Sequence, residues 1–164
     1  MALDNLKLPI QLISQGDVGR VRRELKDLDD FICQANLRQP GTPLKTLPKT
    51  SRGLSDFAAI NKINLLNEGD RESATASLND LIVRAPVVHI SFAVDPSAAF
   101  MAKIAIWFRD KIDPLTLINV GLEPNIAAGC TLQTDNHYHD FSLRQHFYDQ
   151  HQLLMTMIKG EAAR

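Results

Sequence analysis

Four histidines lie close together near the end of the sequence, and their side chains are the ones best suited to chemistry. They are His137, His139, His146 and His151, with Asp135, Asp140 and Asp149 nearby. Imidazole and carboxylate groups are common zinc ligands, and His137 and His139 would share one face of a strand. His146 and His151 are five residues apart on a predicted helix, so their side chains diverge. A small metal-binding enzyme that uses these histidines is therefore one alternative, and surface histidines that bind nothing are the simpler interpretation.

Other sequence patterns that carry catalysis are missing. There is no Gly-x-Ser-x-Gly nucleophile turn, no Gly-Lys-Ser/Thr phosphate loop and no Gly-x-Gly-x-x-Gly dinucleotide motif. Cys130 with a distant histidine is a pairing that any chain of this size could contain by chance. We therefore expect no enzyme activity, no cofactor, and no catalytic, cofactor-binding or metal-binding residues.

Composition narrows the classes of partner. The 164 residues are 45% hydrophobic, which suits one globular domain or a small domain with a helical appendage. A net charge of -1 gives no electrostatic reason to expect nucleic acid or an anionic membrane surface as the main partner. Two distant cysteines, Cys33 and Cys130, without a signal peptide favour a reduced cytosolic protein. No apolar run approaches the roughly 20 residues that span a bilayer, so we expect membrane association only through partners.

The first informative element is a helix predicted from about Asp17 to Leu37. Its apolar residues recur at steps of three and four and form a narrow seam: Val18, Val21, Leu25, Leu28, Ile32 and Ala35. The seam either packs inside its own small bundle or is offered to a partner helix, and its first five residues are our candidate partner-binding residues. A further short helix near Pro9 would make residues 1–38 a helical hairpin.

A break and two more helices follow. Residues 39–50 contain three of the eight prolines, so this stretch is predicted to be a linker. Residues 51–85 are predicted to form a helical region, with one helix over about 54–66 and another over 71–84. The second would place Ala74, Leu78, Leu81 and Ile82 on one face and end before Pro86.

The period changes to that of a strand over residues 87–94, which are rich in branched and aromatic side chains. Asp95 and Pro96 then predict the start of a helix that runs to about Ile112. A stripe of large apolar residues is expected to form its core face: Phe100, Ile104 and Phe108, widened by Met101, Ala105 and Ile112. Trp107, the only tryptophan, lies either in that core or at an interface, and it is our sixth candidate partner-binding residue.

The rest of the chain is predicted to complete a small sheet. Residues 115–121 suit a second strand parallel to the first, and 130–134 and 137–140 suit a hairpin that turns at Asp135 and Asn136. Ala127, Ala128 and Gly129 offer only small side chains where two backbones would approach closely. A last helix runs from Ser142 to Gly160. The predicted class is α+β, with an N-terminal helical region followed by a small βαββα C-terminal domain over residues 86–164.

Three segments in this order resemble a known family. They are Val88 to Ala93, Leu122-Glu123-Pro124-Asn125 followed by Ala128-Gly129, and Asp140-Phe141-Ser142-Leu143-Arg144. Together they are similar to the C-terminal domain of the delta subunit of F-type ATP synthases, called the oligomycin-sensitivity-conferring protein in mitochondria. Glu123 stands where the family usually has aspartate, and Ala128 replaces the first glycine of a pair. The N-terminal half departs from the family's six-helix bundle.

The resemblance implies a mechanical function. A delta-like subunit belongs to the peripheral stalk, or stator, which couples the catalytic head to the membrane-anchored b-subunit stalk in proton-driven ATP synthesis. The implied partners are the b-subunit and the alpha subunits, and the implied location is cytoplasmic, peripheral to the inner face of the plasma membrane. An adaptor of an unrelated complex that reuses the same fold is the other alternative.

Overall fold

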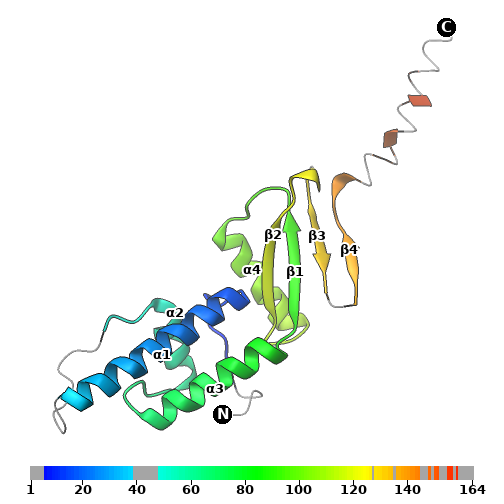
Figure 1. The fold of residues 1–164 in the computed structure, drawn as a ribbon. Coiled ribbons are helices and arrows are strands. Elements are labelled where there is room, and N and C mark those ends of the chain that lie inside the picture. Colours follow the sequence, from blue (N-terminus) through cyan, green and yellow to red (C-terminus); the bar gives the residue numbers. More distant parts are fainter. Residues whose placement is uncertain are drawn as a thin grey trace. The chain divides into compact units, whose positions relative to one another are not determined.

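The computed structural model describes residues 6–38, 48–126, 128–134 and 136–144, and positions 148, 150, 151, 155, 156 and 158. Within these residues the chain is α+β (Figure 1). Its elements are α1 (Gln15–Arg38), α2 (Arg52–Asn61), α3 (Glu68–Arg84), β1 (Val87–Phe92), α4 (Ala98–Lys111), β2 (Leu117–Leu122), a 3-10 turn (Pro124–Ile126), β3 (Cys130–Gln133) and β4 (Tyr138–Asp140). The expected α+β class is confirmed, although three strands follow α4 where the predicted βαββα order has two.

The chain divides into two compact units. The first contains the residues up to Pro86 together with Ala98–Ile118, and the second contains Val87–Ser97 and the residues from Asn119 onward. This division does not follow the predicted boundary at residue 86, because α4 belongs to the first unit. The predicted 39–50 linker lies outside the described residues except for 48–50, which are neither helix nor strand.

The N-terminal segment, residues 6–14, is not helical, so the predicted helical hairpin over 1–38 is wrong in the part that the structure describes. Hydrogen bonds to other segments fix its backbone instead. Lys7 and Asn61 exchange two, in which Lys7 N donates to Asn61 Oδ1 at 2.9 Å and Asn61 Nδ2 donates to Lys7 O at 2.9 Å. Ile118 N donates to Ile13 O at 2.8 Å. These bonds satisfy backbone groups that a helix would have paired internally.

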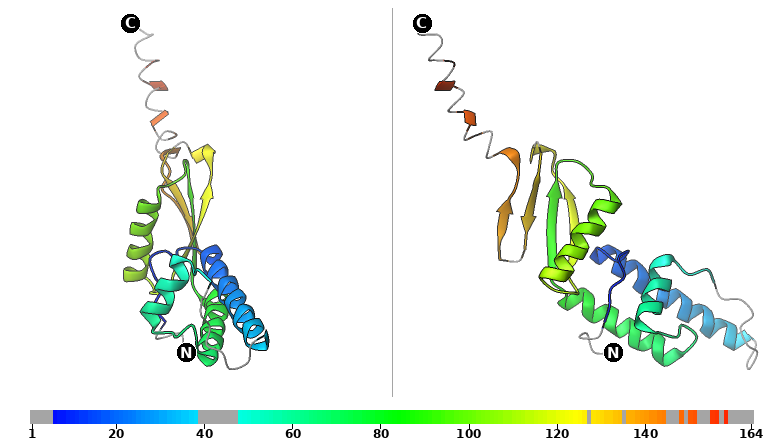
Figure 2. Two further views of the ribbon diagram at one scale, coloured as in Figure 1. Left: turned by 90° about the vertical axis from the view of Figure 1, so that its left-hand side faces the viewer. Right: turned by 180° about the vertical axis from the view of Figure 1, so that it is seen from behind.

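Helices α1, α2 and α3 form a small bundle, in which α1 packs against both of the others. Figures 1 and 2 show α1 and α3 running side by side. Ser14 and Asp17 cap the start of α1, since Ser14 N donates to Asp17 Oδ2 at 3.0 Å and Asp17 N donates to Ser14 Oγ at 3.1 Å. On α3 the predicted face is confirmed, with Ala74, Leu78 and Leu81 buried.

The sheet has the order β2-β1-β3-β4 (Figure 1). β1 and β3 are antiparallel with Ile90 opposite Leu132, and β3 and β4 are antiparallel with Leu132 opposite His139. β1 and β2 are parallel, because Leu117 N donates to Pro86 O at 2.9 Å and Glu123 N donates to Phe92 O at 2.8 Å, at the same sequence offset. The predicted parallel pair and hairpin are thus confirmed.

Helix α4 buries only part of the face predicted for its core side. Met101, Ala105 and Phe108 are buried, whereas Phe100 is 48% exposed and Ile112 is 60% exposed. The helix also begins at Ala98, two residues after the predicted proline start. Apolar residues occupy much of its circumference, so periodicity alone could not select the buried row.

The predicted last helix, 142–160, falls largely outside the described residues. Those described within it from Leu143 onward have helical backbone conformation, and Leu143, Tyr148, Met155 and Ile158 are exposed. Among the described residues, no helix has the length and apolar character that crossing a bilayer requires.

Candidate partner-binding site

The seam predicted on α1 is part of the bundle core. Its five candidate residues are all at most 5% exposed: Val18, Val21, Leu25, Leu28 and Ile32. Helices α2 and α3 occupy the face that these residues form. The hypothesis that this seam is an open docking line for a partner helix is therefore corrected. Three helices bury one another's apolar faces here, which is the ordinary way that short amphipathic helices become stable.

Trp107 is the one candidate residue that the structure leaves at the surface, with 56% of it exposed. Phe100 lies seven residues earlier on α4 and so projects from nearly the same side, with half-buried Ile104 between them. The Trp107 ring meets Phe108 edge to face, with centroids 5.1 Å apart. Because Phe108 is buried, this contact anchors the tryptophan to the core. We call Phe100, Ile104 and Trp107 the α4 strip.

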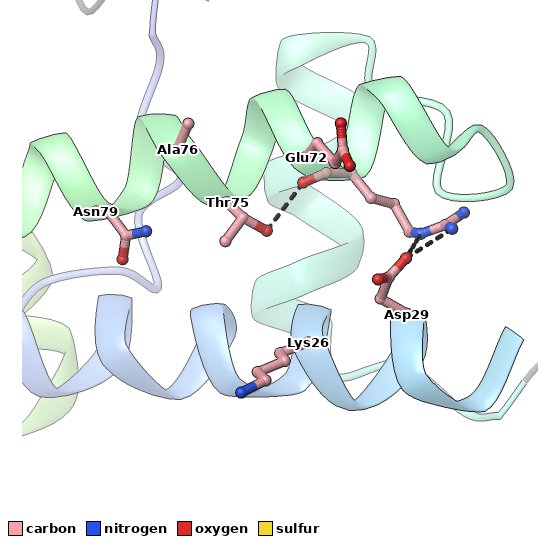
Figure 3. A pocket seen from close by; sticks show the side chains of 7 residues that line it. Lys26, Asp29, Glu72, Thr75, Ala76 and Asn79 are labelled. Carbon is pink, nitrogen blue, oxygen red and sulfur yellow. Dashed lines mark hydrogen bonds and ion pairs between the residues drawn. The ribbon is translucent and has the colours of Figure 1, made fainter. Parts of the chain in front are cut away.

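A groove of about 390 Å³ lies between α1 and α3 (Figure 3). It is lined by Lys26, Asp29, Arg71, Glu72, Thr75, Ala76 and Asn79. A second hollow of about 250 Å³ shares Asp29 and Arg71 with the first and extends to Cys33 and Glu68. Charged and polar side chains form much of the lining of both hollows, joined in the second by Ile32 and Leu37, and no aromatic side chain lines either one.

The ion pair between Arg71 and Asp29 joins α3 to α1 across this groove. Arg71 Nε and Nη2 both lie 2.7 Å from Asp29 Oδ1, and Nη1 donates to Leu65 O at 3.1 Å. The Arg71 side chain is 5% exposed and that of Asp29 is 46% exposed. A buried guanidinium needs such partners, because an unpaired charge there would be costly.

Arg109 fastens the segments around α4. Its guanidinium donates to three backbone carbonyls, those of Pro9, Leu12 and Thr116. Burial lowers the pKa of Arg109 from its ordinary value. The arginine thereby satisfies carbonyl groups of the irregular N-terminal segment and of the turn before β2. Its role is therefore structural.

The start of β3 depends on Gly129, whose φ is +96°. A Cβ atom at this position would lie 2.4 Å from Phe141 O and 2.9 Å from Ser142 Cα. Two further bonds hold the crossing backbones together, Phe141 N to Cys130 O at 2.9 Å and Leu143 N to Ala128 O at 2.9 Å. The close backbone approach expected at the small residues is confirmed.

Asp140 and Ser142 shape the chain after β4. Asp140 Oδ1 accepts a hydrogen bond from Ser142 N at 2.8 Å. Hydrogen bonding to Ser142 lowers the pKa of Asp140, and the charge of Arg144 lowers it further. Burial and then the charge of Asp140 raise the pKa of the Cys130 thiol. Both shifts come from local packing, and a thiol held in its protonated form is a poor nucleophile.

Only part of the histidine cluster is brought together. His139 in β4 and His137 directly before it are exposed, with ring centroids 6.2 Å apart. His151 is exposed, and His146, Asp135 and Asp149 lie outside the described residues. The residues that the structure describes contain no group of three or more histidine, cysteine or acidic side chains placed to hold a metal.

Sequence reasoning missed the polar residues that fasten the first unit, chiefly Arg71, Asn61 and Arg109. The spacing of residues on α3 could have indicated that Arg71 is buried. Arg71 continues the buried row of Ala74, Leu78 and Leu81 at steps of three and four, so a charged residue in line with a core face could have been recognised. Asn61 and Arg109 act through backbone carbonyls far away in sequence, which no local pattern reveals.

No family model matches the chain, and no curated protein matches it.

Proposed function

We propose that this protein is a peripheral-stalk subunit of an F-type ATP synthase, similar to the delta subunit. It would couple the catalytic head to the membrane-anchored b-subunit stalk during proton-driven ATP synthesis. The observation that carries the proposal is the close crossing at Gly129. The small-residue turn of the resemblance packs there against the start of the Asp-Phe-Ser-Leu-Arg segment, through the bonds from Phe141 and Leu143.

The mechanism would be mechanical. A rotary motor transmits torque only while its catalytic head is kept from turning with the rotor, so the stalk must grip the head continuously. Such a connector needs contact area and rigid elements. The α4 strip suits this function, because an aromatic side chain anchored to the core is a typical centre for binding energy. Trp107 therefore remains a candidate contact with a b-subunit helix.

The proposed function also implies where the protein lies and which subunits it binds. The subunit would lie in the cytoplasm at the inner face of the plasma membrane, and would reach the membrane only through the b-subunit and the alpha subunits. The groove of about 390 Å³ between α1 and α3 is the candidate contact for the head, because charged and polar side chains on two helices line it.

Reconstitution tests this function. ATP synthase stripped of the subunit should still hydrolyse ATP but lose ATP-driven proton pumping in vesicles, because the head is no longer held. Adding back the purified protein should restore pumping. If pumping is complete in vesicles whose ATP synthase lacks this protein, the protein is not a stator component.

A further inference from the structure

β4 lies at one end of the described sheet order, and two exposed histidines lie there, His139 within the strand and His137 directly before it. The ring centroids of His137 and His139 are 6.2 Å apart, with 25° between the ring planes. Phe141 continues the row, with its centroid 6.0 Å from that of His139. Side chains two apart on a strand project in the same direction, so the backbone itself sets this pair.

The strand register defines which side chains share the face. His139 is opposite Leu132, which is opposite Ile90, so the imidazoles extend the apolar face of the sheet toward its edge. Tyr138 and Asp140 alternate onto the other face. Both histidines are exposed, so an ion in solution can reach them.

We propose that His137 and His139 form a chelating site for a transition-metal dication such as Zn²⁺. Imidazole nitrogen is a preferred ligand of Zn²⁺, Ni²⁺ and Cu²⁺. Rotation about the Cβ–Cγ bond of histidine is soft, so one nitrogen of each ring can turn toward a shared ion. Water would complete the coordination, because no third ligand is grouped with the pair among the described residues.

This site differs from a catalytic or structural zinc centre, which normally has three or four protein ligands. Two ligands on an exposed strand give an ion that exchanges readily and leaves positions open. The proposal does not depend on the stator function, since it rests on β4 alone.

The test is a calorimetric titration of the full-length protein, without an affinity tag, with Zn²⁺. We expect one ion per chain, with affinity reduced at least about tenfold in His137→Ala and in His139→Ala, because loss of even an outer-shell partner costs about 10–100-fold. His89→Ala is the matched control, since His89 is exposed on β1 but lies on the opposite face. The double variant H146A/H151A controls for the remaining histidines.

A second measurement keeps the proposal testable if a variant fails to fold. In the wild-type protein, Zn²⁺ should shift the imidazole NMR signals of two of the five histidines together. Unchanged affinity in either single variant, loss of binding in H146A/H151A, or a shift of the His89 signal with the others unchanged would overturn the site.

Discussion

At the scale of single residues, the second unit depends on one glycine and carries one protected thiol. Gly129 has a φ of +96° and leaves no room for a Cβ atom. Cys130, the next residue, has a pKa raised by burial and by Asp140. Both positions belong to the crossing of residues 128–130 with residues 141–143.

Gly129→Ala should destabilise the protein. The positive φ alone costs on the order of 1–3 kcal/mol for a residue with a Cβ atom, and the contact with Phe141 O adds to it. Chemical denaturation followed by circular dichroism measures the change. Gly19→Ala, inside α1 with nothing within 4 Å, should instead stabilise the protein by about 0.5–1 kcal/mol. Equal effects of the two substitutions would contradict the argument.

The two thiols should differ in reactivity. Cys33 is exposed, whereas Cys130 is partly buried and its pKa is raised above the ordinary value of 9.0. Since the thiolate is the reacting form, Cys130 should alkylate more slowly than Cys33 at pH 8 and approach it only as the pH rises. Mass spectrometry after timed iodoacetamide labelling gives both rates in one sample. Faster labelling of Cys130 would contradict the structure.

At the scale of elements, the first unit is a bundle fastened by polar contacts. The five-residue seam of α1 forms its core, and the Arg71–Asp29 pair ties α3 to α1. The α4 strip remains exposed on a helix that is itself anchored by Arg109. On α4, the residues that hold the fold are thus distinct from Trp107 at its surface.

Asp29→Ala should cost roughly 3 kcal/mol of unfolding free energy. This is the lower end for breaking a buried pair, because the aspartate is half exposed and water can partly replace it. Asp30→Ala is the control, since Asp30 is the next residue on α1 and is exposed. Urea denaturation compares the two. A loss of stability in Asp30→Ala that matches Asp29→Ala would show that the pair has no special role.

Trp107→Ala and Phe100→Ala should each weaken binding to the soluble part of the b-subunit by about tenfold, or about 1.4 kcal/mol. Their truncation removes exposed aromatic area, so the fold should be unchanged. Ile106→Ala is the control, because Ile106 is 50% exposed but lies about 100° around the helix from Trp107. Calorimetric titration measures the affinities. If both aromatic variants bind the b-subunit with wild-type affinity, the α4 strip is not a contact with it.

At the scale of the whole molecule, much of the architecture follows from local patterns. Branched residues after Pro86 predicted β1, and the small residues at 127–129 predicted the close approach at Gly129. The inward face of α4 was predicted too broadly, because apolar residues surround much of that helix and Phe100 and Ile112 prove to be exposed. The seam on α1 left two interpretations open for a related reason. A narrow apolar row has the same spacing whether it meets another chain or its own bundle, and only the positions of α2 and α3 decide between them.

The proposed stator function predicts specific binding partners for the intact protein. The most direct measurement is gentle purification of the native protein from detergent-solubilised membranes, with quantitative mass spectrometry of the proteins that accompany it. The proposal predicts alpha, beta and b-type ATP synthase subunits at fixed stoichiometry. A soluble monomer, or a complex without ATP synthase subunits, would contradict it.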